Sequence, residues 1–274
     1  MAEPRSGENQ KDNQRSLIGE QRVLSISFDR AAAIYDETRG GEQRGKLCAE
    51  ALEPWFSSSG LTLEIGVGTG LVGAALQDGG RRIVGVDISV QMLQRARGRN
   101  LTVARADGVA LPFASGSVDD AYSVWVLHLV ADPAAVLREA MRILRPGGRY
   151  LVELTSAFDR EHDEIAFILR EMDLQLRDGQ PPRDAPKRIL PLAEEGGLHL
   201  VGIVERSADV FMESPLEAAA GIERRDFCKL WDLDADRWQA IVEPALTALR
   251  ALPEPERQRE RRVVHEIIVL EKPH

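Results

Sequence analysis

The chain has 274 residues, 43% of them hydrophobic and 29% charged, which is enough to bury a sizeable hydrophobic core. Its formal net charge of -9 at pH 7 argues against nucleic acid as a partner, because a surface that follows phosphates needs a cationic patch. Two distant cysteines cannot form a disulfide scaffold and no apolar run reaches the roughly 18 residues of a membrane span, so we expect a cytoplasmic protein with no membrane partner.

The N-terminal part of the chain is predicted to be a polar tail followed by helices. Residues 1–16 carry almost no apolar side chains and no apolar segment of a signal peptide, so we expect a disordered tail. Apolar residues recur at helical spacing over 22–36, and a second helical pattern covers 42–55. We therefore place N-terminal helices within 22–56, at the start of a single domain that covers 17–274.

Short apolar runs alternate with helical patterns from residue 61 onward. The predicted strands cover 61–65, 82–86, 101–105, 119–124 and 150–154, and helices are predicted over 71–77, 89–98 and 133–144. Such an alternation predicts an α/β fold with a parallel sheet and helices on both faces. The rest of the chain predicts a helix over 161–176, a strand over 198–204, a helical block over 213–252 and a last strand over 263–270.

Two pairs of neighbouring arginines stand out in this acidic chain, Arg224 with Arg225 and Arg261 with Arg262. Acidic residues lie close to both pairs in the sequence. We interpret both pairs as parts of solvated helix faces rather than as a nucleic-acid-binding surface.

The first predicted strand runs directly into three glycines at alternate positions, Gly66, Gly68 and Gly70, and a predicted helix follows. Glycines allow a tight turn and let backbone N–H groups approach a ligand closely, and the helix N-terminus adds partial positive charge. Such a loop favours a nucleotide-containing cofactor over a turn without a ligand. It does not separate the cofactor classes, because Gly73 completes the Gly-x-Gly-x-x-Gly fingerprint of an NAD(P)-dependent oxidoreductase, with Asp87 as its ribose acid.

Two acidic residues near the loop shift this balance. Glu64 lies just before the first glycine, where a carboxylate would repel a pyrophosphate and favour a cofactor with an ammonium and a positive sulfur. Asp87 follows the second predicted strand, where its two oxygens would accept hydrogen bonds from both ribose hydroxyls. Glu64 therefore favours a sulfonium nucleoside with an amino-acid tail over a dinucleotide, with Asp87 as the acid on its ribose.

Several motifs occur in order along residues 28–155. They are Phe28-Asp29 with Tyr35-Asp36, Glu64-x-Gly66-x-Gly68-x-Gly70, the stretch from Asp87 to Leu93, Ala106-Asp107-Gly108, Ser117-Val118-Asp119 and Leu144-Arg145-Pro146-Gly147-Gly148. In order and spacing they resemble the class I S-adenosylmethionine-dependent methyltransferases, especially the small-molecule branch with its quinone and natural-product methyltransferases. The resemblance implies a Rossmann-like, mostly parallel sheet of seven strands in the order 3-2-1-4-5-7-6, with the last strand antiparallel. It also implies a helical lid from insertions at about 158–190 and 213–258.

The resemblance implies, in addition, which residues bind S-adenosyl-L-methionine. Asp87 would bind the ribose, and Ile88 and Met92 would lie beside the adenine. Asp107 would meet the adenine amino group. The full expected set is Tyr35, Arg39, Glu64, Gly66, Val67, Gly68, Gly70, Asp87, Ile88, Met92, Ala106, Asp107, Gly108 and Val124.

The segment after the fourth predicted strand bears on the reaction. It lacks the [Asp/Asn]-Pro-Pro-[Tyr/Phe] motif expected of enzymes that methylate exocyclic amines of bases or glutamine side chains. We therefore expect methyl transfer to an oxygen, carbon or other nitrogen of a small organic acceptor, without a metal ion. His128 follows this strand at the ligand-binding edge and is the candidate general base, although a histidine that is only packed fits the sequence equally well. The alternatives are an NAD(P)-dependent oxidoreductase and a protein that binds S-adenosylmethionine without catalysis.

Overall fold

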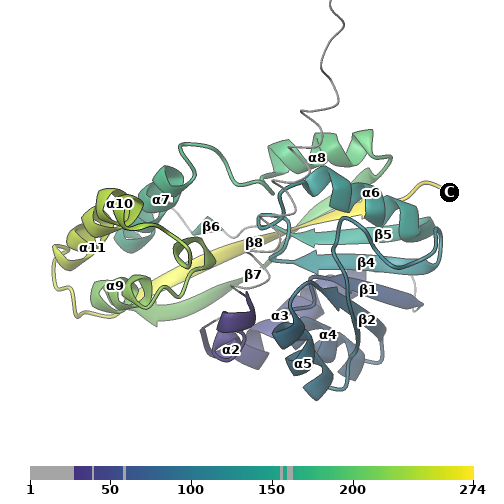
Figure 1. Cartoon of the computed structure of the whole chain (residues 1–274), viewed down its shortest axis with the longest axis horizontal. Helices are drawn as coiled ribbons and strands as arrows, with labels where there is room; N and C mark the ends of the chain where they lie inside the picture. The colour runs from purple at the N-terminus through teal and green to yellow at the C-terminus, as the bar shows by residue number, and fades with distance from the viewer. Residues whose placement is uncertain (1–27, 39, 58–59, 155–156, 159–162) are drawn as a thin grey trace, which may run out of the picture.

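A computed structural model describes residues 28–38, 40–57, 60–154, 157–158 and 163–274 of the chain. The expected tail at 1–16 and the candidate Arg39 lie outside these residues. The described chain forms a mixed sheet with helices on both faces and a group of helices beyond one end of it (Figure 1).

Five parallel strands make up the part of the sheet that comes first in the chain. They are β1 (Leu61–Ile65), β2 (Arg82–Asp87), β3 (Thr102–Arg105), β4 (Val118–Val124) and β5 (Leu144–Glu153), in the spatial order β3-β2-β1-β4-β5. The central strand β1 is buried at four of its five positions, as expected of a parallel strand that is covered on both faces. The predicted parallel, Rossmann-like sheet is confirmed.

Two long strands complete the sheet, β7 (His199–Glu213) and β8 (Arg259–Glu271). β8 lies between β5 and β7 and is antiparallel to both. With β7 and β8 counted as the sixth and seventh strands, the expected order 3-2-1-4-5-7-6 is confirmed. The structure adds an eighth strand, the two-residue β6 (Ala157–Phe158), which also pairs with β8.

Helices cover both faces of the parallel strands (Figure 1). One face packs against α3 (Gly41–Leu52), α4 (Leu71–Asp78) and α5 (Val90–Gly98), and the other packs against α6 (Pro133–Ile143) and α8 (Pro186–Glu195). The short helix η1 (Glu53–Trp55) continues α3. Local sequence signals set two of these starts, because Ser89 caps α5 and Asp132 caps α6 ahead of a proline at the first helical position.

The remaining helices gather into a separate group, which we call the helical cluster. It consists of α7 (Glu164–Leu176), α9 (Pro215–Glu223), η2 (Cys228–Leu230), α10 (Ala235–Arg237), η3 (Trp238–Val242) and α11 (Glu243–Arg250). Its buried apolar side chains form a core distinct from the two cores on the sheet, with Ile165, Ile222 and Leu249 among its fully buried members. The cluster contains much of both expected lid insertions, whereas α8 packs against the sheet. The division into one domain with a lid stays a prediction.

The paired strands β7 and β8 carry the helical cluster beyond the sheet. Glu153 at the end of β5 pairs with Ile267, but β8 begins at Arg259, where it pairs with Glu213. The β7–β8 ribbon therefore runs past the carboxyl ends of the parallel strands (Figure 1). The helical cluster lies at the far end of this ribbon, facing the edge of the sheet where ligands of such folds bind.

Arg261 corrects one interpretation of the sequence. Its side chain is only 2% exposed and lies in β8, where Nε donates to Asp163 Oδ2 at 2.9 Å and Nη1 pairs with Glu213. The helix predicted at Arg261 and Arg262 is therefore wrong, and so is the solvent exposure predicted at Arg261, whereas Arg262 is exposed on the strand. The two carboxylates compensate the buried charge, so a strand continues where the apolar pattern of the sequence stops.

Candidate active site

The three glycines after β1 all have positive φ angles, +78° at Gly66, +52° at Gly68 and +84° at Gly70. A Cβ on Gly66 would clash with Val126, and one on Gly70 would lie 2.6 Å from Leu101 Cδ1. A Cβ on Gly68 would meet nothing within 4 Å. The loop is thus packed at its first and last glycines and borders open space at the middle one, as a cradle for a ligand requires.

Asp87 ends β2 beside this open space. Its Oδ2 accepts a hydrogen bond from the Gly68 amide at 2.8 Å, and its Oδ1 accepts one from the Ser89 amide at 2.8 Å. Burial raises the pKa of Asp87, while these backbone donors oppose that rise. A carboxylate held at the mouth of an open glycine loop fits the two hydroxyls of a cofactor ribose.

Glu64 does not take the place that its charge suggested. The side chain is 3% exposed and lies beneath the loop, beside the Tyr122 hydroxyl and the backbone of Gly73. A Cβ on Gly73 would be 2.5 Å from Glu64 Oε2. Burial raises the pKa of Glu64 to about 8, so the carboxyl group is mostly neutral at pH 7. The electrostatic argument against a diphosphate therefore does not hold, and contact between Glu64 and the cofactor stays a prediction.

The residues expected near the adenine lie along the carboxyl ends of β2 and β3. The Ala106 amide donates to the Asp87 carbonyl at 3.1 Å, which places the following Asp107 next to Asp87 in the fold. Asp107 Oδ1 accepts a hydrogen bond from the backbone two residues on, at 3.1 Å. A Cβ on Gly108 would lie 3.1 Å from Ile65, so this turn also reaches the end of β1.

Three other expected cofactor residues are buried beneath the loop rather than open to it. They are Val67, Met92 and Val124, which are 4%, 1% and 6% exposed. Ile88 follows Asp87 and is partly exposed, so it is better placed to touch a ligand. Direct contact of all four with the cofactor stays a prediction.

The N-terminal segment closes over the loop, but not as the continuous helix expected over 22–36. Residues 28–31 are helical, a turn follows, and α2 (Tyr35–Thr38) is a separate short helix; residues 22–27 lie outside the described chain. Contacts with α5 account for the break. Asp29 Oδ1 accepts hydrogen bonds from Ser89 Oγ and the Gln91 amide, and Arg95 Nη2 donates to the Ala33 carbonyl.

Asp36 fastens α2 to the glycine loop. Its Oδ1 accepts a hydrogen bond from Thr69 Oγ1 at 2.5 Å, and its Oδ2 pairs with Arg99 Nη2 at 2.8 Å. Arg99 also donates to the Thr69 carbonyl at 3.1 Å. We call these three residues the Asp36 latch.

Aromatic contacts extend this cover to the helical cluster. Tyr35 packs edge-on against Phe28 with 6.2 Å between ring centroids, and Phe28 packs edge-on against Trp231 at 5.0 Å. The N-terminal segment thus bridges the glycine loop and the helices at the end of the ribbon. Tyr35 lies in this cover, and its contact with a cofactor stays a prediction.

His128 lies in the turn after β4, at the carboxyl edge of the sheet. Its Nδ1 is buried and lies 3.7 Å from Oδ2 of Asp184, a fully buried carboxylate. Burial alone lowers the pKa of His128, but Asp184 and Cys228 outweigh it and raise the pKa to about 9. The side chain is therefore a cation at neutral pH, and it acts as a base only after that proton has left.

Three residues at this edge were not predicted from the sequence, namely Trp125, Glu153 and Asp184. Glu153 carried a signal, because a carboxylate inside a buried strand demands a partner. No sequence signal pointed to Asp184, because it lies in an irregular segment far from His128 in the sequence.

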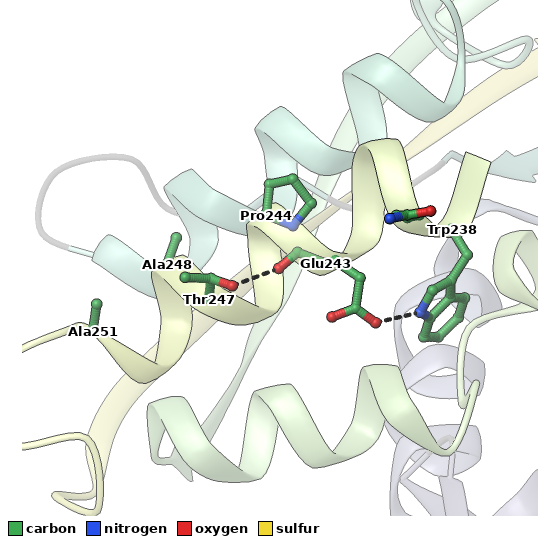
Figure 2. A pocket seen from close by; sticks show the side chains of 7 residues that line it. Trp238, Glu243, Pro244, Thr247, Ala248 and Ala251 are labelled. Carbon is green, nitrogen blue, oxygen red and sulfur yellow. Dashed lines mark hydrogen bonds between the residues drawn. The ribbon is translucent and has the colours of Figure 1, made fainter. Parts of the chain in front are cut away.

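A shallow groove on the helical cluster does not belong to this site (Figure 2). It is lined by Trp238, Gln239, Glu243, Pro244, Thr247, Ala248 and Ala251. Six of the seven come from the continuous run of η3 and α11, which Ala251 directly follows, and α11 lies well away from α4, the helix that the glycine loop leads into (Figure 1). Trp238 Nε1 donates to Glu243 Oε1 at 2.8 Å along this surface.

No group of three or more His, Cys, Asp or Glu side chains among the described residues is arranged to hold a metal ion. No helix among them has the length and apolar character needed to cross a bilayer.

Comparison with known proteins identifies the domain. Residues 63–152, from β1 to β5, match the family model described as a methyltransferase domain. The sheet order, the open glycine loop and the acid at the end of β2 agree with that match. The segment from β1 to β5 is therefore similar to a methyltransferase domain.

Two named relatives align with this chain over stretches longer than residues 63–152. A demethylmenaquinone methyltransferase of Corynebacterium kroppenstedtii is 40% identical over 137 residues, which cover 48% of this chain and 59% of that protein. A malonyl-[acyl-carrier protein] O-methyltransferase of Herminiimonas arsenicoxydans is 30% identical over 174 residues, which cover 63% of this chain and 61% of that protein. The chain thus spans about three fifths of the length of either relative.

Among solved structures, the [4+2]-cyclase SpnF superposes with a TM-score of 0.59 at 17% identity. The match covers 92% of this chain and 96% of that one. At this identity the likeness shows the fold alone.

Proposed function

We propose that the protein transfers a methyl group from S-adenosylmethionine to an oxygen, carbon or nitrogen of a small organic acceptor. The observation that carries this proposal is the open side of Gly68 with the Asp87 carboxylate beside it, within a matched methyltransferase domain. S-adenosylmethionine supplies a methyl group on a positive sulfur, which is an activated leaving group. Asp87 binds the ribose hydroxyls, and the loop amides bind the amino-acid part.

The remaining residues position the acceptor and exclude water. The N-terminal segment and the helical cluster cover the carboxyl edge of the sheet, where they keep water from the sulfonium. Alignment of acceptor and methyl group is the main catalytic contribution, and such alignment is worth roughly 7–11 kcal/mol in favourable cases. His128 holds a proton at the same edge and receives one from the acceptor when its own has left.

The acceptor is a small organic molecule rather than a nucleic acid. The two relatives are named for different acceptors, demethylmenaquinone and malonyl-acyl carrier protein, so the shared domain does not fix which one is used. The acidic composition supports the same class. The chain has two cysteines, Cys48 and Cys228, and no disulfide scaffold, which supports a cytoplasmic location.

Binding and turnover test the proposal separately. Calorimetry with S-adenosylhomocysteine and with NAD is expected to show micromolar binding of the first only. Transfer of label from methyl-labelled S-adenosylmethionine is then measured with reduced demethylmenaquinone and with malonyl-acyl carrier protein. Binding without transfer to any acceptor supports the non-catalytic alternative, and NAD binding alone overturns the proposal.

The Asp87→Asn variant ties the result to the described geometry. The variant should bind S-adenosylhomocysteine at least about tenfold more weakly, because one carboxylate oxygen that accepts a hydrogen bond from the ribose is replaced by an amide group that donates. Asp78→Asn is the matched control, since Asp78 is exposed at the end of α4. Equal affinities of the two variants would contradict the placement of the ribose.

A further inference from the structure

A buried charged network surrounds Glu153 at the end of β5. This carboxylate is fully buried, and four side chains from other parts of the chain surround it. Its Oε2 accepts from Cys48 Sγ at 2.9 Å, and its Oε1 lies 2.9 Å from His265 Nδ1. Oε1 also accepts from Trp125 Nε1 at 2.8 Å.

The network continues into the β7–β8 ribbon. Arg206 is 1% exposed and lies between Glu153, at 3.6 Å, and Asp209, at 3.0 Å. His265 Nε2 lies 2.8 Å from Asp209 Oδ2. Burial alone raises the pKa of Glu153, but His265 and Arg206 outweigh it and lower the pKa below the ordinary value. Glu153 therefore stays ionised and remains a strong hydrogen-bond acceptor.

Trp125 connects this network to the segment that packs on the glycine loop. It follows β4 directly and has a φ of 57°, a conformation that costs a bulky side chain free energy and persists only where its surroundings enforce it. Two contacts enforce it here. Glu153 holds the indole N–H, and the Arg44 guanidinium lies 3.9 Å from the ring centroid.

Trp125 lies beside the glycine loop and His128 at the carboxyl edge of the sheet. The next residue, Val126, packs against Gly66 at the start of the glycine loop, and His128 lies in the same turn. The indole remains partly exposed although its edge is bound and Arg44 stacks on it. The indole also packs against the hydrophobic core on the α3 side of the sheet, and its exposed part leaves an aromatic surface at the ligand-binding edge.

We propose that Trp125 forms a wall of the acceptor site and that Glu153 and Arg44 are the positioning residues that hold its indole there. The proposal rests on the proposed function and narrows it, because an indole surface favours an acceptor with a flat, apolar ring. Since the charges of the network are paired with one another, this wall offers the acceptor an aromatic surface and no free charge.

The chain contains a matched control for this arrangement. Trp238 donates to Glu243 at 2.8 Å, the same distance as between Trp125 and Glu153, but on the outer surface of the helical cluster (Figure 2). The same substitutions can therefore be made in the Trp125–Glu153 pair and in the Trp238–Glu243 pair, which lie in different parts of the fold.

The test uses 1-naphthol, a flat bicyclic probe, added to the protein saturated with S-adenosylhomocysteine. In ¹H–¹⁵N spectra the probe is expected to shift the indole N–H signal of Trp125, assigned through Trp125→Phe, and to leave that of Trp238 unchanged. Trp125→Phe and Glu153→Gln should each lower the affinity for 1-naphthol about tenfold, as measured by calorimetry. Either substitution removes the charged hydrogen bond that fixes the ring. Trp238→Phe and Glu243→Gln should bind it like the wild type.

Three outcomes would overturn the proposal: no binding of 1-naphthol, a shift confined to other indoles, or equal affinity in wild type and Trp125→Phe. Trp125→Phe keeps every charge of the network, so it serves even if Glu153→Gln fails to fold. With an accepted acceptor, Trp125→Phe should raise the KM of that acceptor and leave the KM of S-adenosylmethionine unchanged. Probe binding at Trp125 without any methyl transfer would defeat the proposed function alone, whereas transfer with an unchanged acceptor KM in Trp125→Phe would defeat this inference alone.

Discussion

Glu64 places an ionisable carboxyl group in the interior, with consequences for the pH dependence of stability. Its pKa is about 8 in the folded chain, above the ordinary value of 4.5. Between these values the unfolded chain loses the proton and the folded chain keeps it, so the free energy of unfolding falls as pH rises through this window.

Glu64→Gln should remove this loss, because the amide does not ionise. We expect the variant to be more stable than the wild type at pH 8, by up to about 4 kcal/mol, and to differ little at pH 5. Urea unfolding at pH 5, 6.5 and 8 measures the effect, with Glu50→Gln on the exposed face of α3 as the control. Parallel pH dependences of wild type and Glu64→Gln would show that the carboxyl group is ionised in the folded chain.

The pKa of His128 predicts how the rate of methyl transfer depends on pH. Because its pKa is about 9, methyl transfer that uses His128 as a base should rise with pH up to about 9. Asp184→Asn removes the partner that raises this pKa, so the rise should move to lower pH. The pH profile of kcat checks this, with Asp178→Asn as the control because that side chain is 81% exposed. A profile that is the same in His128→Gln and the wild type would exclude a base role.

At the scale of elements, α2 is too short to hold itself in place. Four residues form little more than one turn, so its position over the loop depends on side-chain contacts. The Asp36 latch supplies them, and the ion pair within it is partly exposed, with side-chain exposures of 18% and 23%.

Loosening the latch should speed release of the cofactor. We expect Asp36→Asn to lower the affinity for S-adenosylhomocysteine about fivefold, mainly through a faster dissociation rate. This change corresponds to about 1 kcal/mol, as expected for a partly exposed ion pair. Stopped-flow displacement measures that rate. Glu37→Gln changes the neighbouring exposed carboxylate of the same helix and should leave it unaltered. Indistinguishable rates for the two variants would show that α2 does not gate the loop.

The strands show what local sequence reveals and what it hides. β1 was predicted at its observed bounds because its apolar run ends at a glycine turn. β7 and β8 extend well beyond the predicted 198–204 and 263–270, since Arg206, Asp209 and Arg261 interrupt the apolar pattern. Those charged side chains form ion pairs within the ribbon and with neighbouring elements. Because these pairs form only in the folded chain, a short stretch of sequence does not reveal them.

For the molecule as a whole, the strand order follows from few rules and could be predicted. Alternating strands and helices impose right-handed crossovers and a parallel sheet, which brings the Gly66–Gly70 loop and Asp87 to one edge. The acceptor side could not be predicted in the same way. Cys48, Trp125, Glu153 and His265 meet there from separate parts of the chain, and no periodicity encodes their distances.

The register of the ribbon has a consequence for how such a molecule changes over evolutionary time. Glu213, the last residue of β7, pairs with Arg259, the first of β8, so residues 214–258 leave and re-enter the scaffold at a single point. A segment whose ends are neighbours can be replaced without moving the framework that carries it. The parallel strands and the glycine loop can thus be inherited intact while residues 214–258 are exchanged for other helices.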